Sequence, residues 1–273
     1  MDLDNIKRHW TEWAKAGVDL RATTKTGTIK SLEIAALVRA IRRSGMESRQ
    51  RTVLEAGCGN GQNCVALAAE FANFKFVGFD YVDAMVQSAR LLAESNGVTD
   101  RLNFVVGDML NLAKCNLADK YDVVFTDRAV INLNTEELQL QVISVLAARV
   151  APGGLLLLLE NFVETYERQN DCRELLGLQR RTPAEFNRFL VGEHVKSLVC
   201  GLGFDLVTID DFGSLHDLLL YVLLPAVNEG QINYDDPIVA AATELCLRLG
   251  SVEADLFGRF GQNRLMVFQS PIR

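Results

Sequence analysis

The sequence contains no apolar run long enough to cross a membrane. Its longest run, LLLYVLLPAV at residues 218–227, is about half as long as a membrane-spanning helix. The N-terminal stretch MDLDNIKRHW is polar and carries no apolar signal core. The six cysteines include no C-x-x-C pair, a pattern that fits a reducing compartment. We therefore expect a cytoplasmic protein with no membrane partner.

The sequence also lacks an excess of basic residues. Its formal net charge is −7, which argues against a nucleic-acid partner because neutralising phosphates requires a basic surface. Histidine is scarce, and His9, His194 and His216 are too far apart along the chain to indicate a metal site. No metal is expected.

Proline is rare as well, and its five occurrences mark no linker. Apolar residues make up 49% of the chain, enough for a sizeable core. We predict a single domain over residues 1–273. It would comprise an N-terminal helical cap at 1–45, a core at 50–212 and 262–270, and a helical insertion at 213–261.

From residue 52 onward, strand-like and helix-like segments alternate. The expected strands are TVLEAG (52–57), FKFVGFD (74–80), LNFVVGD (102–108), YDVVFTD (121–127), GLLLLLEN (154–161), FDLVTIDDF (204–212) and NRLMVFQ (263–269). The expected helices cover residues 62–72, 81–97, 134–154 (capped by Asn134 or Thr135) and 182–203. This alternation predicts an α/β fold with a mostly parallel sheet and helices on both faces. Ligands of such sheets bind beyond the carboxyl ends of the strands.

A glycine-rich turn follows the first strand, in VLEAGCGNGQN at residues 53–63. Glycine reaches backbone angles closed to other residues and lets a ligand approach the main chain. The spacing is G-x-G-x-G, with Gln62 at the third glycine of the NAD fingerprint G-x-G-x-x-G. Asp80 ends the second strand, where a carboxylate can accept bonds from ribose hydroxyls. Asp108 follows the third strand, where it can accept the amine of adenine beside Met109.

With these residues in view, the chain resembles the class I S-adenosylmethionine-dependent methyltransferases. The matching pieces are VLEAGCGNGQN, FVGFD, FVVGDML, YDVVFTD and APGGLLLLLEN, in family order and at family spacing. The resemblance covers about residues 50–270 and implies a seven-stranded Rossmann-like sheet whose last strand is antiparallel between the fifth and sixth. It implies S-adenosyl-L-methionine as cofactor. The residues it assigns to that cofactor are Glu55, Gly57, Cys58, Gly59, Gly61, Asn63, Asp80, Tyr81, Asp108, Met109 and Thr126.

A narrower resemblance links the chain to a subgroup of bacterial methyltransferases that modify cell-envelope polysaccharides and small molecules. It is carried by TDRAVINL, LENF and LRATTKTGTIKSLEI. In that subgroup the N-terminal segment folds over the cofactor, which makes Arg21, Thr23, Thr24 and Lys25 candidates to close the site. Arg21 would pair with the methionine carboxylate, a charge-assisted bond that suits a guanidinium.

The methyl acceptor is expected beyond the fourth strand. There the chain reads TDRA at residues 126–129 instead of the D/N-P-P-Y turn of enzymes that methylate DNA or protein glutamine. Arg128 is a candidate to bind an anionic acceptor and Asp127 to hold a hydroxyl; a local ion pair between them is the alternative. His216 is the first choice for a general base. Further candidates for acceptor binding are Asn132, Glu160, Asn161 and Arg173.

The resulting hypothesis is a methyltransferase acting on a small molecule or sugar, most readily at oxygen. Two alternatives stay open: an NAD-dependent oxidoreductase, and a catalytically inactive partner subunit that binds the cofactor. The insertion at 213–261 would roof the acceptor pocket or form a homodimer, and the sequence does not choose between the two.

Overall fold

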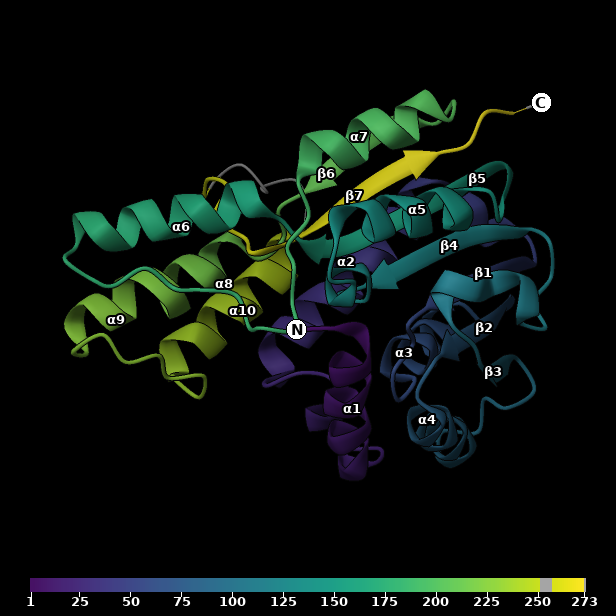
Figure 1. Ribbon diagram of the computed structural model, residues 1–273, viewed down its shortest axis with the longest axis horizontal. Helices are drawn as coiled ribbons and strands as arrows, with labels where there is room; N and C mark the ends of the chain where they lie inside the picture. The colour runs from purple at the N-terminus through teal and green to yellow at the C-terminus, as the bar shows by residue number, and fades with distance from the viewer. Residues whose placement is uncertain (251–256, 273) are drawn as a thin grey trace.

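A single seven-stranded sheet organises the computed structural model, which describes residues 1–250 and 257–272 (Figure 1). Its strand order is β3-β2-β1-β4-β5-β7-β6. All neighbouring strands are parallel except β7, which is antiparallel to both β5 and β6. The strands are β1 (Arg51–Ala56), β2 (Phe74–Asp80), β3 (Leu102–Val106), β4 (Tyr121–Asp127), β5 (Val150–Asn161), β6 (Asp205–Asp210) and β7 (Asn263–Gln269). The predicted Rossmann-like sheet is thereby confirmed.

Helices cover both faces of this sheet. One face packs against α2 (Gly27–Arg43), α3 (Gln62–Glu70) and α4 (Asp83–Ser95), and the other against α5 (Glu136–Ala147) and α7 (Gly192–Gly201). The central strands are buried on both sides, as their near-continuous apolar runs require. Leu155 to Leu159 in β5, for example, are at most 2% exposed. Thr135 caps α5 by accepting a hydrogen bond from the Leu138 N–H.

The N-terminal segment lies at the carboxyl ends of the strands. It forms α1 (Leu3–Trp13) and two short turns, Ala14–Ala16 and Leu20–Ala22, before α2 begins. Figure 1 shows α1 standing beside α3 and α4. The Trp10 indole donates to the Asn132 side chain across 3.2 Å, which ties α1 to the turn after β4.

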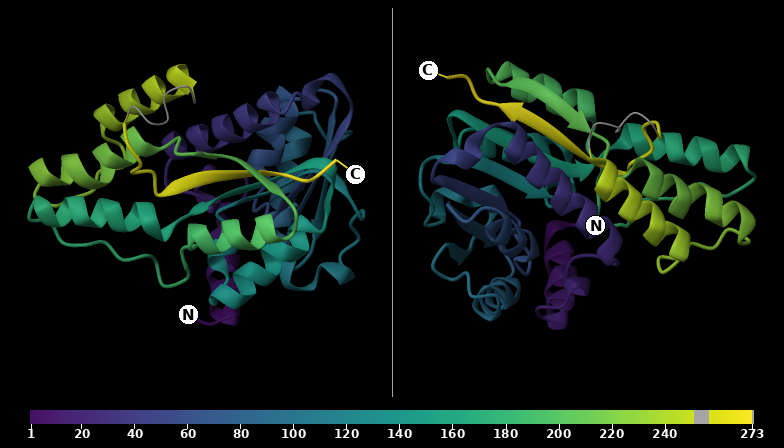
Figure 2. Two further views of the ribbon diagram at one scale, coloured as in Figure 1. Left: turned by 90° about the horizontal axis from the view of Figure 1, so that it is seen from above. Right: turned by 180° about the vertical axis from the view of Figure 1, so that it is seen from behind.

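Between β6 and β7 the chain forms α8 (Ser214–Leu218), a π-helical turn (Leu219–Leu223), α9 (Leu224–Val227) and α10 (Pro237–Leu249). Together with α6 (Val163–Leu175) these helices gather at one end of the molecule, away from α4 (Figures 1 and 2). Part of the predicted insertion, residues 251–256, lies outside the described residues. No helix in the described part of the chain is long and apolar enough to cross a membrane.

The predicted helix at 182–203 is wrong in its first half. Residues up to Leu190 run as an irregular and extended segment, and α7 begins only at Gly192. The reason is pairing with the sheet, because the Leu190 N–H donates to the Asn161 carbonyl across 2.9 Å. Helix α6 was not predicted. Its buried residues are largely polar, so the sequence shows no apolar stripe there.

Candidate functional site

A cavity of about 720 Å³ opens at the carboxyl ends of the parallel strands. That size lies in the range of small-molecule sites. Its wall combines the N-terminal segment, the glycine-rich turn, the ends of β2, β4 and β5, and the beginning of the insertion. Segments that are far apart in sequence therefore meet around one space, at the position where α/β sheets bind ligands.

The glycine-rich turn contributes Gly57 and Gly59 to this wall. Both have positive φ angles, 72° and 50°. A Cβ atom on Gly59 would lie 2.6 Å from the Thr23 methyl group, so only glycine fits beneath the N-terminal segment. Gly61 also has positive φ, but it faces Ala89 and Phe104 rather than the cavity. The structure thus brings two of the three predicted glycines to the site, and the third starts α3.

Asp80 lies at the end of β2 with only 7% of its surface exposed. Its carboxylate accepts hydrogen bonds from the N–H groups of Gly59 (3.0 Å) and Val82 (2.9 Å). Burial raises the pKa of Asp80 to about 6. Each carboxylate oxygen keeps acceptor capacity for a further donor. The side chain is therefore positioned to receive hydroxyl groups from a ligand.

Three other predicted cofactor residues line the same cavity: Tyr81, Asp108 and Met109. Asp108 accepts a hydrogen bond from the Leu110 N–H across 2.9 Å, which fixes the turn after β3. Burial raises the pKa of the Tyr81 phenol, so it stays neutral. This part of the wall thus combines the Tyr81 ring and the Met109 thioether with the carboxylates of Asp80 and Asp108.

Glu55, at the end of β1, lines the cavity and is bonded to the first turn of α3. Its carboxyl group is 1% exposed, and it accepts hydrogen bonds from Asn63 (2.7 Å) and the Cys64 thiol (3.0 Å). Burial raises its pKa to about 8, so the group is protonated near neutral pH. Asn63 and Cys58 line the cavity, whereas Thr126 is fully buried in β4 and does not.

The N-terminal segment rests directly on the glycine-rich turn. The Asn60 amide donates to the carbonyls of Gly17 (3.0 Å) and Asp19 (2.9 Å). Thr23, Thr24 and Lys25 line the cavity, as predicted from the narrower resemblance. Arg21 does not: it points to solvent, and its guanidinium pairs with Asp19 across 2.8 Å. The predicted contact of Arg21 with a ligand carboxylate therefore has no basis in this structure.

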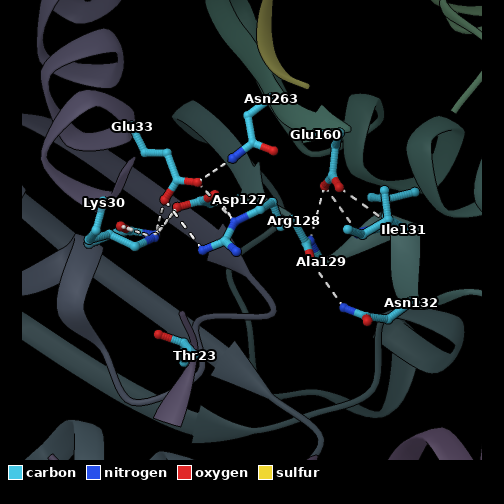
Figure 3. A network of polar contacts seen from close by, with 12 residues as sticks. Thr23, Lys30, Glu33, Asp127, Arg128, Ala129, Ile131, Asn132, Glu160 and Asn263 are labelled. Atoms are coloured by element: carbon cyan, nitrogen blue, oxygen red, sulfur yellow. Dashed lines mark hydrogen bonds and ion pairs between the residues drawn. The ribbon is translucent and has the colours of Figure 1, made fainter. Parts of the chain in front are cut away.

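A buried network of charges joins α2 to the end of β4 (Figure 3). The Lys30 ammonium lies 2.5 Å from the Asp127 carboxylate and 2.7 Å from that of Glu33. Burial alone would lower the pKa of Lys30, but these two carboxylates raise it. Burial likewise opposes ionisation of Asp127, yet the charges of Lys30 and Arg128 hold the pKa of that carboxyl below its usual value. The pKa of Glu33 shifts the other way, because burial outweighs its two cationic partners and raises it.

Arg128 belongs to this network and also lines the cavity, with 22% of its side chain exposed. Its Nε atom lies 2.9 Å from Glu33 and 3.5 Å from Asp127, and Figure 3 shows its guanidinium directed at Glu33. Asn263 of β7 donates to the same Glu33 across 2.6 Å. The predicted role of Arg128 in binding an anionic acceptor is therefore not supported, because its charge is already balanced. The alternative, an ion pair that shapes the turn, describes the structure.

Two more acceptor candidates have structural roles. The Glu160 side chain accepts hydrogen bonds from the N–H groups of Ala129, Val130 and Ile131 (Figure 3) and lies behind the cavity wall. Burial raises its pKa to about 7. Arg173 donates to the carbonyls of Gln179 and Tyr221 and does not line the cavity.

Asn132 and Asn161 both reach the cavity. The Asn132 amide donates to the Arg128 carbonyl across 2.9 Å. Asn161 is 1% exposed, and its side-chain oxygen has no hydrogen-bond partner among the described residues. A buried polar atom without a partner is uncommon, so Asn161 is the better candidate of the two for a ligand contact.

His216 lines the cavity from the first turn of the insertion. Its Nδ1 atom lies 2.8 Å from the Asp217 carboxylate, and its Nε2 atom lies 3.2 Å from the Thr28 hydroxyl. Asp217 in turn accepts the Gln262 N–H across 2.6 Å. With the Nδ1 proton on the Asp217 side, the lone pair of Nε2 faces the hydroxyl, which is the orientation of a general base.

Several residues of the site carry no local sequence signal. Lys30 and Glu33 lie in an ordinary amphipathic helix, and their role appears only when β4 approaches. Arg181, Tyr221 and Tyr234 also line the cavity. They come from an irregular segment and from the insertion, where the sequence has no motif, so only the tertiary structure reveals them.

The fold and these strand-end carboxylates define a binding site for an adenosyl-type cofactor. The residues fit such a group, because Asp80 and Asp108 offer acceptors and the glycines expose the main chain. A family model described as a methyltransferase domain matches residues 47–185. The chain belongs to this family, the class I S-adenosylmethionine-dependent methyltransferases, and its cofactor is S-adenosyl-L-methionine.

Relatives of known function match only part of the chain. A sterol 24-C-methyltransferase of Pneumocystis carinii is 29% identical over 104 residues, which are 38% of this chain and 26% of that protein. A malonyl-[acyl-carrier protein] O-methyltransferase of Ilyobacter polytropus is 35% identical over 79 residues, 29% of this chain and 27% of that protein. The match thus spans about a quarter of each relative's length.

Among solved structures, the fold is similar to magnesium protoporphyrin IX methyltransferase from Synechocystis PCC 6803, which was determined with bound SAH. The TM-score is 0.60 and the identity 16%, with 98% of this chain and 97% of the other covered. The similarity extends over nearly the whole length, including the N-terminal segment and the insertion.

Asp80→Asn should weaken the binding of S-adenosylhomocysteine by roughly tenfold or more, because an amide replaces one charged acceptor oxygen with a donor. Since the pKa of Asp80 is about 6, we also expect the wild-type affinity to fall as pH drops below 6. The affinity of the variant should stay flat over that range. Titration calorimetry from pH 5 to pH 8 measures both effects.

Asp83→Asn is the matched control, since Asp83 is exposed at the start of α4 and bonds to Gln87. Binding by the Asp80 variant within twofold of the Asp83 control would contradict the assignment.

Proposed function

We propose that this methyltransferase transfers a methyl group to an oxygen atom of a small-molecule or sugar acceptor. The observation that carries the proposal is the pair His216–Asp217, whose imidazole lines the same cavity as Asp80 and the glycine-rich turn. An alcohol is a poor nucleophile until its proton is removed, and a positioned imidazole supplies that base.

The cofactor residues would be Gly57, Gly59, Asp80, Asp108 and Met109, all of which line the cavity. When bound, S-adenosyl-L-methionine supplies a methyl group on a sulfonium, ready for in-line displacement. The protein's own contribution is alignment of the reacting groups and exclusion of water.

His216 holds the proton-accepting position. Its Nε2 atom contacts the Thr28 hydroxyl across 3.2 Å, and in the proposed reaction this lone pair turns from Thr28 to the acceptor hydroxyl. Asp217 keeps the imidazole oriented and stabilises the imidazolium that forms. Asp217 is held in turn by one main-chain donor, the Gln262 N–H, and one side-chain donor, the Gln169 amide.

The names of the relatives do not choose the acceptor atom. One is named for methylation at carbon and the other for methylation at oxygen, so the oxygen assignment comes from the His216–Asp217 pair. The link to polysaccharide biosynthesis is part of the same proposal and rests on the narrower resemblance carried by TDRAVINL, LENF and LRATTKTGTIKSLEI. The NAD-dependent alternative is disfavoured by the family match.

An acceptor screen tests the proposal. Purified enzyme is incubated with S-adenosylmethionine and with alcohol, amine and thiol forms of the same carbon skeletons, and formation of S-adenosylhomocysteine is measured. We expect turnover with alcohols. Turnover confined to amines or thiols would refute oxygen transfer. Tight cofactor binding without turnover on any acceptor would favour the inactive partner subunit.

A further inference from the structure

Two of the cations on the cavity wall, Lys25 and Arg181, lie against one group of aromatic rings without a carboxylate partner; Lys7, which also forms no ion pair among the described residues, lies elsewhere, over Tyr81. Lys25 comes from the N-terminal segment and Arg181 from the irregular segment before α7, and both line the cavity. In residues 1–250 and 257–272, no carboxylate lies within ion-pair distance of either one. Their neighbours are instead aromatic rings and neutral amides.

Arg181 is held in place by stacking. Its guanidinium lies 3.6 Å from the ring centroid of Tyr221 and 5.3 Å from that of Tyr166. Its two terminal nitrogens donate to the side-chain oxygens of Gln169 and Gln262, each across 3.1 Å. A guanidinium has five N–H donors, and two of those on Arg181 are engaged by these contacts.

Lys25 completes a row in which two tyrosine rings lie between two cations. Its ammonium lies 5.4 Å from the ring centroid of Tyr234. The rings of Tyr234 and Tyr221 are 6.4 Å apart and meet edge to face. The order along the wall is therefore Lys25, Tyr234, Tyr221 and Arg181.

The carboxylates near this row are already committed. Asp217 bonds to His216 and to the Gln262 N–H. Asp127 and Glu33 are balanced by Lys30 and Arg128. In the described part of the chain, none of these three carboxylates forms an ion pair with Lys25 or Arg181.

We propose that Arg181 and Lys25 form a subsite for an anionic group, a phosphate or a carboxylate, carried by the methyl acceptor. A stacked guanidinium is preorganised and weakly hydrated, which suits it to bidentate recognition of either anion. The inference builds on the proposed function, because the anion would fix the acceptor on the wall that also carries His216. The role of binding an anionic acceptor, which the sequence predicted for Arg128, is thus assigned to Arg181.

The test measures binding in the presence of saturating S-adenosylhomocysteine. The probes are glucose 6-phosphate, glucuronate and uncharged glucose, titrated separately in a calorimeter. We expect at least one of the two anions to bind and glucose not to bind. The anion that binds identifies phosphate or carboxylate as the recognised group.

Variants then assign the subsite. Arg181→Gln and Lys25→Gln should each weaken anion binding by roughly tenfold, the loss expected for one charge-assisted contact. Arg180→Gln is the matched control, because the neighbouring Arg180 pairs with Glu167, Asp171 and Glu174 outside the cavity. Its anion affinity should equal that of the wild type. Because Lys25 is exposed, Lys25→Gln should fold. It therefore tests the subsite even if Arg181→Gln does not fold.

The failure of this inference is distinct from failure of the proposed function. If S-adenosylhomocysteine binds but neither anion does, the subsite is refuted and the enzyme assignment stands. Anion affinity in folded Arg181→Gln and Lys25→Gln equal to that of Arg180→Gln would refute it as well. If S-adenosylhomocysteine itself does not bind, the proposed function fails first.

Discussion

Replacement of His216 by glutamine should lower kcat by roughly 10²- to 10⁴-fold, the usual contribution of a general base. The glutamine amide reaches about as far as the imidazole Nε2 atom and can keep the contact with Thr28, so the fold should persist. An amide has no basic lone pair near neutral pH, and the acceptor hydroxyl would then lose its proton acceptor. Affinity for S-adenosylhomocysteine should stay unchanged, because the contact of His216 is with Thr28 and Asp217.

The measurement is a steady-state assay with the acceptor that supports turnover, together with calorimetry for the cofactor product. His194→Gln is the control: His194 is exposed on α7 and pairs with Glu136 outside the cavity. Asp217→Asn should lower kcat less than His216→Gln, because Asp217 positions the imidazole without contacting the acceptor. A His216 variant with kcat within threefold of the control would remove His216 from the chemistry.

Lys30→Met should lower the free energy of unfolding by about 3–5 kcal/mol, the range found when one partner of a buried ion pair is removed. The Lys30 side chain is 7% exposed, and those of Glu33 and Asp127 are at most 1% exposed. Without the ammonium, two buried carboxylates would share the single charge of Arg128. Because the Glu33 and Asp127 side chains are almost completely buried, solvent compensates poorly and the folded state bears most of the cost.

Urea denaturation followed by circular dichroism measures this change. Lys15→Met serves as the control, because Lys15 forms a surface pair with Glu12 in which both side chains are at least 60% exposed. Such pairs contribute about 1 kcal/mol or less. The double variant Lys30→Met, Glu33→Gln should recover part of the loss, since it removes one charge of each sign. Equal unfolding midpoints for Lys30→Met and Lys15→Met would show that the network does not stabilise the fold.

The sequence predicted the sheet well because its strands are defined locally. The apolar run in residues 154–161 and the glycines at its start lead to β5, and the run at 74–80 coincides with β2. Short apolar runs between turn signals leave few other structures open. The cofactor half of the site was also predictable, since Gly57, Asp80 and Asp108 sit at fixed positions relative to their own strands.

The acceptor half of the site was not predictable, because the roles of its side chains depend on partners from distant parts of the chain. Arg128 looks free in the sequence, but its partner Glu33 lies 95 residues earlier on α2. Glu160 looks like a rim residue, yet it satisfies three main-chain N–H groups of the turn after β4. In both cases the competing partner comes from another element, and a linear pattern carries no record of it.

Helix α6 shows the same limit at the level of secondary structure. It buries Thr165, Gln169, Asn170 and Arg173 instead of an apolar stripe. Three of these side chains, Gln169, Asn170 and Arg173, donate to main-chain carbonyls of the segments packed around them, among them those of Phe260, Arg181 and Gln179. Periodicity detects helices through apolar faces, so a helix whose buried face is polar escapes detection.

The insertion leaves the sheet at the end of β6 and returns at the start of β7, two strands that pair directly through Asp210 and Leu265. The two ends of the insertion are therefore neighbours in space, where the antiparallel pair of β6 and β7 begins. Such an arrangement allows the insertion to change in sequence and length without disturbing the strands that bind the methyl donor. The part of the cavity wall that carries His216 and Tyr221 can therefore vary independently of the strand ends that carry Asp80 and Asp108.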